Sequence, residues 1–208
     1  MSLKIASIKE KTFYFSIFFF VSSGYLLTSQ LALSSAPHPT AFMEWEKNIP
    51  YGEYFIIPYF SYFIIPLLAF FAFKQTSNIM RQFVFIFALI AIVSLTIFVF
   101  YPHQFGWKRP APTTGFETIR VMLAFLEADE VYNTFPSLHV SFTVAFWYMM
   151  KDHIKNRIFY HLTWSWLVLI VLSTLFVFQH HFVDVVTGIF LFYAAYAVTH
   201  IKLLRQFF

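Results

Sequence analysis

The 208-residue chain is 59% hydrophobic and 23% aromatic, whereas only 12% of its residues are charged. Ordinary globular proteins carry about 25% charged residues, so the composition excludes a typical soluble fold and indicates a chain surrounded mostly by lipid. The net charge of +4 is spread between apolar segments, and there is no cysteine. This favours a membrane surface over nucleic acid as partner and excludes disulfides, thiolate metal sites and a cysteine nucleophile.

Six apolar segments predict membrane-spanning helices, each of which needs about 20 mostly apolar residues. We expect these helices at about residues 12–33, 54–73, 83–101, 136–150, 158–178 and 183–203. The fourth segment is short; Pro136 suits its first helical position and Thr134 suits its N-cap. The predicted fold class is therefore an all-α integral membrane protein, with one six-helix transmembrane domain over residues 1–208.

The positions of lysine and arginine predict the orientation of these helices. With the N-terminus in the cytoplasm, ten of these residues lie inside, and four lie outside, namely Lys47, Lys108, Arg109 and Arg120. We therefore expect a multi-pass protein of the cell (inner) membrane with both termini cytoplasmic. A cleaved signal peptide is the alternative for the first segment, but its apolar run is long for a signal.

The longer loops, at about residues 34–53 and 102–135, are both outside in this topology. Residues 118–130 of the second loop predict a short interfacial helix. Val121, Met122, Phe125 and Leu126 would share one face of it.

Polar side chains gather where several of these segments meet the outer face. The residues at this depth are Lys108, Arg109, Ser137, His139, His180 and Asp184. A helix N-terminus and a guanidinium suit a phosphate group. The spacing of His180 and Asp184 lets a carboxylate orient an imidazole, while His139 supplies a second imidazole for proton transfer.

Two neighbours of these residues are expected to have no part in the chemistry. We expect His181 to be exposed, because it faces away from any partner three residues on. Ser173 is expected to bond to its own helix backbone.

Three motifs at this face resemble those of the type 2 phosphatidic acid phosphatase superfamily of membrane lipid phosphatases and phosphotransferases. The family motifs are Lys-x6-Arg-Pro, Pro-Ser-Gly-His and Ser-Arg-x5-His-x3-Asp. Here the first keeps Arg109-Pro110 but has Pro102 in place of Lys, and the second reads Pro-Ser-Leu-His at residues 136–139. The third has Thr174 in place of Arg. The motif forms are also similar to the branch related to inositol phosphorylceramide synthases.

The resemblance implies an extracytoplasmic active site that removes phosphate from a lipid phosphate or diphosphate. His180 would attack phosphorus to form a phosphohistidine, Asp184 would fix its tautomer, and His139 would protonate the leaving oxygen. Arg109, Ser137 and Lys108 would bind the phosphate; Lys108 is a candidate replacement for a missing cation. No metal or other cofactor is implied, and the expected partners are a lipid phosphate substrate and membrane lipids.

Two other functions remain open on the sequence. A lipid phosphotransferase would pass a phosphoryl headgroup to an alcohol acceptor. A non-catalytic protein, either a transporter or a haem-binding bundle using His139 and His180, is less favoured. Both histidines lie at segment ends near cations, which suits an anion better than a haem.

Overall fold

The computed structural model describes residues 7–33, 40–72, 77–127 and 132–201. Apart from one isolated antiparallel bridge between Gln104 and Tyr132, the regular structure of these residues is helical. The α-helices are α1 (Ile8–Leu33), α2 (Ile56–Ala72), α3 (Ser77–Phe100), α4 (Glu117–Glu127), α5 (Leu138–Met150), α6 (Arg157–Phe176) and α7 (Phe182–Thr199). Three short 3₁₀ helices are η1 (Glu44–Asn48), η2 (Glu53–Phe55) and η3 (Lys151–His153). The all-α prediction is confirmed.

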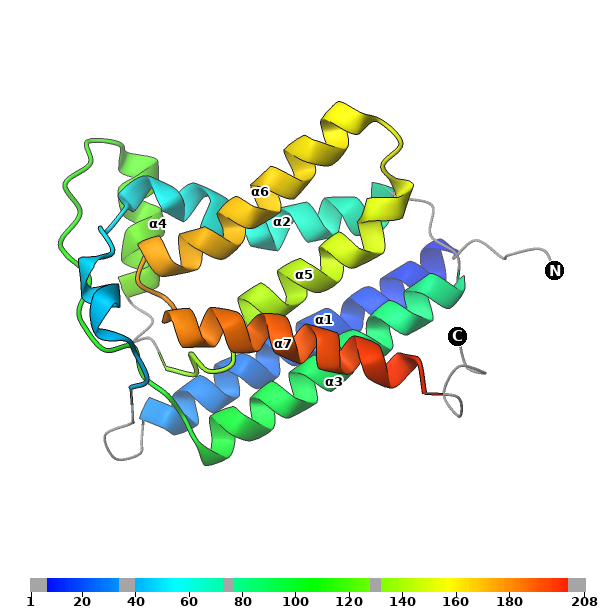
Figure 1. Ribbon diagram of the computed structural model, residues 1–208, viewed down its shortest axis with the longest axis horizontal. Helices are drawn as coiled ribbons and strands as arrows, with labels where there is room; N and C mark the ends of the chain where they lie inside the picture. The colour runs from blue at the N-terminus through cyan, green and yellow to red at the C-terminus, as the bar shows by residue number, and fades with distance from the viewer. Residues whose placement is uncertain (1–6, 34–39, 73–76, 128–131, 202–208) are drawn as a thin grey trace.

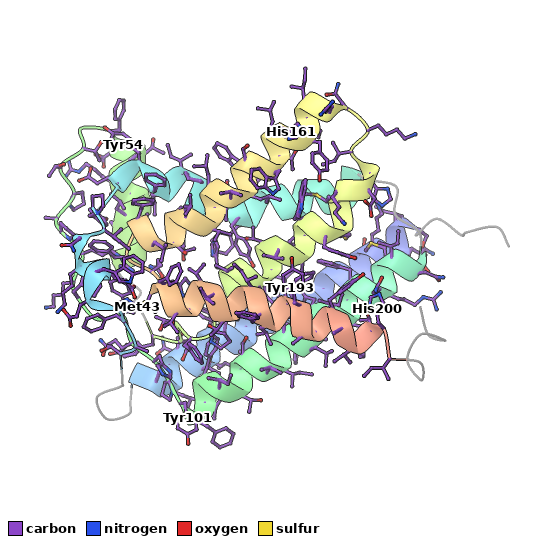
Figure 2. All side chains as sticks on the ribbon, viewed as in Figure 1. Met43, Tyr54, Tyr101, His161, Tyr193 and His200 are labelled. Carbon is purple, nitrogen blue, oxygen red and sulfur yellow. The ribbon has the colours of Figure 1, made fainter. Side chains whose placement is uncertain are left out.

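Each of the six predicted apolar segments overlaps one long helix. Figure 1 shows that α1, α2, α3, α5, α6 and α7 alternate in direction, while α4 lies across one end of the bundle. Met43, Tyr54 and Tyr101 mark this end in Figure 2, whereas His161 and His200 lie toward the other. Every loop that carries a predicted site residue therefore reaches the end that bears α4.

Three helices within the described residues are long and apolar enough to cross a membrane: Asn78–Phe100, Arg157–Phe176 and Phe182–Thr199. These candidate spans indicate an integral membrane protein. Helix α5 has 13 residues and is about 20 Å long at 1.5 Å per residue, less than the hydrocarbon core of about 30 Å.

Helix α5 forms the centre of the bundle, where it contacts α2, α3, α6 and α7. Most of its side chains are buried, which explains why an apolar helix shorter than the hydrocarbon core is stable here. Phe142 of α5 stacks on Phe87 of α3 at a centroid distance of 3.9 Å. The N-terminus of α5 is thereby held at the α4 end, which is where the predicted site residues begin.

Helix α4 confirms the predicted short helix, and Met122 of the predicted apolar face packs, partly buried, against the protein. Ile119 and Leu123 are buried against Ile56, Tyr59 and Val177. Val121, which was expected on the apolar face, is 60% exposed. Residues 128–131 and the side chains of Phe125 and Leu126 lie outside the described part of the chain.

The described cations separate between the two ends of the bundle. The α4 end has the four cations predicted to be outside, and the other end has Lys9, Lys11, Arg81, Lys151, Lys155 and Arg157. Lys4, Lys74, Lys202 and Arg205 lie outside the described residues. The uneven distribution on which the topology prediction depends is therefore kept in three dimensions.

Candidate active site

The turn between α6 and α7 carries His180 and is built by a C-terminal capping motif. Phe178 adopts a left-handed backbone with φ of 54°, and the amides of Phe178 and Gln179 donate to the carbonyls of Leu175 and Thr174. This is a Schellman-type cap, in which glycine is the usual left-handed residue. For a residue with a side chain, this left-handed conformation costs about 1–2 kcal/mol of conformational free energy. Packing of the Phe178 ring against Tyr51 and other aromatic residues offsets that cost.

His180 lies between a backbone carbonyl and a carboxylate. Its Nδ1 is 2.9 Å from the carbonyl oxygen of Thr134 and 3.6 Å from Oδ2 of Asp184. A carbonyl oxygen only accepts hydrogen bonds, so the shorter contact requires the hydrogen of a neutral ring on Nδ1. The lone pair of His180 is then on Nε2. The spacing prediction brought His180 and Asp184 together correctly, but it missed Thr134.

The segment before α5 fixes the position of the Thr134 carbonyl. Asn133 has a left-handed backbone with φ of 61°, which asparagine tolerates better than most residues. Its Nδ2 donates to Thr28 and Ser29 of α1, and the Thr134 amide donates to the carbonyl of His103. Bonds to two other parts of the fold therefore hold this segment against His180.

Ser137, and not Thr134, is the N-cap of α5. Its Oγ accepts from the Val140 amide at 3.2 Å, and Leu138 is the first helical residue. The prediction of Pro136 as first helical residue with Thr134 as its cap is therefore wrong, because the capping hydroxyl comes one residue after Pro136. Ser137 is fully buried, and its hydroxyl oxygen faces the first turn of α5.

Asp184 joins the start of α7 to the start of α5. Its Oδ2 accepts from the His181 amide at 2.8 Å, which is stabilising at a positive helix N-terminus. Its backbone carbonyl accepts from the Ser137 amide at 3.2 Å. Asp184 is only 1% exposed, so its charge acts on His180 in a region from which most water is excluded.

Close packing between α5 and α7 depends on Gly188. A Cβ atom at this position would lie 2.7 Å from the backbone oxygen of Ser137. The Oγ of Ser141 bridges the gap by donating to the carbonyls of Gly188 and Ser137 at 2.8 and 2.9 Å. A larger side chain at position 188 would therefore push the segment 137–139 away from the turn that carries His180.

His139 is buried against aromatic rings of α2. The ring centroids of Tyr59 and Tyr62 lie 4.5 and 3.8 Å from that of His139. Its Nε2 is buried without a hydrogen-bond partner among the described residues. His139 lies in the first turn of α5, two residues after its N-cap Ser137, and the carbonyl that contacts His180 belongs to Thr134, five residues earlier.

The predicted phosphate-binding cations differ in their surroundings. Arg109 is half-buried, and its Nε donates to the carbonyl of Val177 at 2.9 Å, at the C-terminal cap of α6. Lys108 is exposed.

Thr174, in the position of the missing family arginine, turns its hydroxyl back to the Val171 carbonyl. Ser173 bonds similarly to Ile170, as predicted.

His181 is buried, and its predicted exposure is wrong. It is 1% exposed, because Glu46 of η1 reaches the start of α7 and the ring of Phe105 stacks on the imidazole at 4.2 Å. Glu46 is a site neighbour that sequence reasoning missed. Glu46 lies in a predicted outer loop and is part of no motif. The aromatic residues around it in that loop are the sequence signal that could have indicated its burial.

Glu53 fixes the loop that follows α3. Its carboxylate accepts from the amides of Thr113 and Thr114. Among the described residues, no three His, Asp or Glu side chains form a group that would hold a metal ion.

The sequence model of the PAP2 superfamily matches residues 54–198, which is well over half of the chain. The protein therefore belongs to the PAP2 superfamily, and this membership suggests a phosphatase-type activity. No curated protein and no solved structure matches the chain. The match leaves the resemblance to the inositol phosphorylceramide synthase branch as a hypothesis.

Proposed function

We propose that the protein is a lipid phosphate phosphatase that works through a phosphohistidine on His180. The observation that carries the proposal is the contact between His180 Nδ1 and the Thr134 carbonyl. It directs the Nε2 lone pair away from the backbone, as a nucleophile requires. Nε2 forms a bond to phosphorus while the bond from phosphorus to the leaving oxygen breaks.

Asp184 and His139 have different roles in this reaction. The buried carboxylate of Asp184 stabilises the positive charge that develops on His180. His139 donates a proton to the leaving oxygen and then accepts one from the water that attacks phosphorus, so that the phosphorus–nitrogen bond breaks and His180 is restored. The assignment is supported by the place of His139 in the first turn of α5, five residues after the Thr134 carbonyl that contacts His180.

The phosphate oxygens would be bound by the guanidinium of Arg109, the Ser137 hydroxyl, the first turn of α5 and, from the surface, Lys108. A helix N-terminus and an arginine both favour phosphate. The whole reaction needs no metal ion in this scheme. We therefore expect turnover to persist in a chelator.

The balance of charge gives one specific reason to keep the phosphotransferase as second candidate. Arg109 is half-buried and bonds to the end of α6, while the buried acids Asp184 and Glu46 both accept from backbone amides at the start of α7. A phosphomonoester carries about −1.5 to −2 charges near neutral pH, whereas a phosphodiester carries one. A site with this balance favours the diester, as in transfer of a phosphoryl headgroup to an alcohol.

We also propose that all six predicted segments cross the inner membrane, the fourth by way of α5 together with the residues that flank it, with both termini in the cytoplasm and the site at the outer face. The separation of cations between the two ends of the bundle supports this orientation. A transporter would use the same residues to line a path for anions. It would form no phosphoenzyme, which separates it from both enzyme hypotheses.

One assay distinguishes these functions. Purified protein is incubated with a panel of ³²P-labelled phosphatidate, isoprenyl diphosphate and phospholipid diesters, with and without an added alcohol. A phosphatase releases inorganic phosphate and a transferase labels the alcohol; both form an acid-labile, base-stable phosphoenzyme that His180→Ala abolishes. Absence of phosphoenzyme and of turnover on the whole panel contradicts the proposal.

A further inference from the structure

We propose that Glu46 and His181 are positioning residues that hold the phosphate-binding loop and the His180 turn in register. The inference rests on the proposed function, and it extends the site to a residue outside the matched segment 54–198. Neither is a fixed residue of the motifs at the site, because Glu46 lies outside them and His181 takes a variable position between His180 and Asp184. Both are 1% exposed.

The Glu46 carboxylate contacts N–H donors of three residues. Oε1 accepts from the Met43 amide at 2.7 Å. Oε2 accepts from the Phe182 amide and lies 3.0 Å from His181 Nδ1. Phe182 is the first residue of α7, so the negative charge lies at the positive end of a helix. A buried carboxylate is stable only with such partners.

The two ring nitrogens of His181 have opposite roles. The Gly106 amide donates to Nε2 at 3.0 Å, so Nε2 carries no hydrogen. Nδ1 must then carry the hydrogen and donate it to Glu46. The neutral ring thereby connects an acceptor on η1 to a donor in the loop after α3. Stacking against Phe105 fixes its plane.

This chain of bonds ends on both halves of the proposed site. Gly106 is three residues before Arg109, and Phe182 is two residues after His180. Loss of the Gly106 bond frees the loop that presents Arg109 to the phosphate. Loss of the Glu46 bonds frees the start of α7, where Asp184 and His180 are held. The first defect weakens substrate binding, and the second slows the chemical step.

Two substitutions of His181 separate these effects. In His181→Asn the amide nitrogen is near the position of Nδ1 and still donates to Glu46, but Gly106 loses its acceptor. In His181→Gln the amide oxygen is near the position of Nε2 and accepts from Gly106, but Glu46 loses a donor. Because a misplacement of about 1 Å costs about 100-fold, we expect changes of about 10- to 100-fold.

The test measures kcat and KM on the best lipid substrate, with thermal unfolding in detergent to establish that each variant is folded. We expect His181→Asn mainly to raise KM and His181→Gln mainly to lower kcat. Glu44→Gln is the matched control, because Glu44 lies on the same 3₁₀ helix but is exposed, and its carboxylate pairs with the exposed Lys47. It should behave as wild type.

Wild-type turnover distinguishes the possible failures. An inactive wild type that forms no phosphoenzyme overturns the proposed function and this inference together. An active wild type with unchanged KM and kcat in both folded His181 variants overturns the positioning role alone, as does an equal loss in Glu44→Gln. If the His181 variants do not fold, Glu46→Gln, which keeps the side-chain size, takes their place: reduced kcat supports the inference and wild-type kinetics overturn it.

Discussion

The Nδ1 atom of His180 lies 2.9 Å from the carbonyl oxygen of Thr134. The Asp184 carboxylate is farther away, at 3.6 Å. The backbone therefore sets the tautomer of His180, and Asp184 acts on the ring mainly through its charge. The resemblance to the family had assigned the tautomer of His180 to Asp184.

The exchange Asp184→Asn tests this division. In a Ser-His-Asp triad the equivalent exchange costs about 10⁴-fold in kcat because the histidine takes the wrong tautomer. Here Thr134 keeps the tautomer, so we expect a smaller loss, of about 10- to 100-fold, in the rate of phosphoenzyme formation. Asn retains an oxygen for the His181 amide, so the unfolding temperature should change little. A loss near 10⁴-fold would show that Asp184, and not the Thr134 carbonyl, sets the tautomer of His180.

Substitution of His139 tests its role as the acid. His139→Phe keeps an aromatic ring against Tyr59 and Tyr62 but removes the proton donor. General acid catalysis contributes about 10²- to 10⁴-fold, so turnover of an alkyl phosphate should fall by that order. An aryl phosphate, whose leaving oxygen needs little protonation, should lose far less. Equal losses measured on both substrates would exclude the acid role.

Gly188→Ala should damage both stability and activity. The new Cβ would lie 2.7 Å from the Ser137 carbonyl oxygen, and overpacking of this kind costs about 1–3 kcal/mol. We expect a lower unfolding temperature in detergent and reduced kcat, because α5 and α7 must separate. Gly115→Ala is the control, since its Cβ would meet no atom of the described residues within 4 Å beyond its own chain neighbours. Wild-type stability of Gly188→Ala would contradict the proposed close contact.

The loop after α3 should loosen in acid through Glu53. Hydrogen bonds, chiefly from the Thr113 amide, lower the pKa of Glu53 below its usual 4.5. A lowered pKa in the folded state means that the stabilisation is present above about pH 4.5 and is lost as the pH falls through the folded-state pKa. NMR of ¹³C-labelled carboxyl groups should show this midpoint below 4.5. Hydrogen exchange of the Thr113 and Thr114 amides should depend on pH more steeply than the intrinsic exchange rate does. Glu53→Gln should remove this excess.

Cysteine labelling tests the orientation in the membrane, since the chain has no cysteine of its own. Thr113→Cys in the exposed loop should react with an impermeant maleimide in intact cells. Lys155→Cys, in the exposed connection between α5 and α6, should react only after lysis. The reverse pattern would place the site on the cytoplasmic side and overturn the proposed topology.

The sequence by itself determined the helical class, the approximate positions of the long helices and the set of motif residues. Apolar runs specify helices in lipid because backbone groups there must be satisfied within each segment. The spacing of His180 and Asp184 was also sufficient to predict that the two side chains lie close together, since both residues lie at the short turn between α6 and α7. These features are local, so the order of residues defines them directly.

Only the tertiary structure decided which groups surround those residues. The partner of His180 is the backbone carbonyl of Thr134, and a carbonyl is present at every position and so leaves no mark in a sequence. The burial of His181 depends on Glu46, which is 135 residues away along the chain. A polar residue looks exposed in a sequence until the fold brings it the distant partner that makes its burial stable, and this is why the Glu46–His181 pair was not predicted.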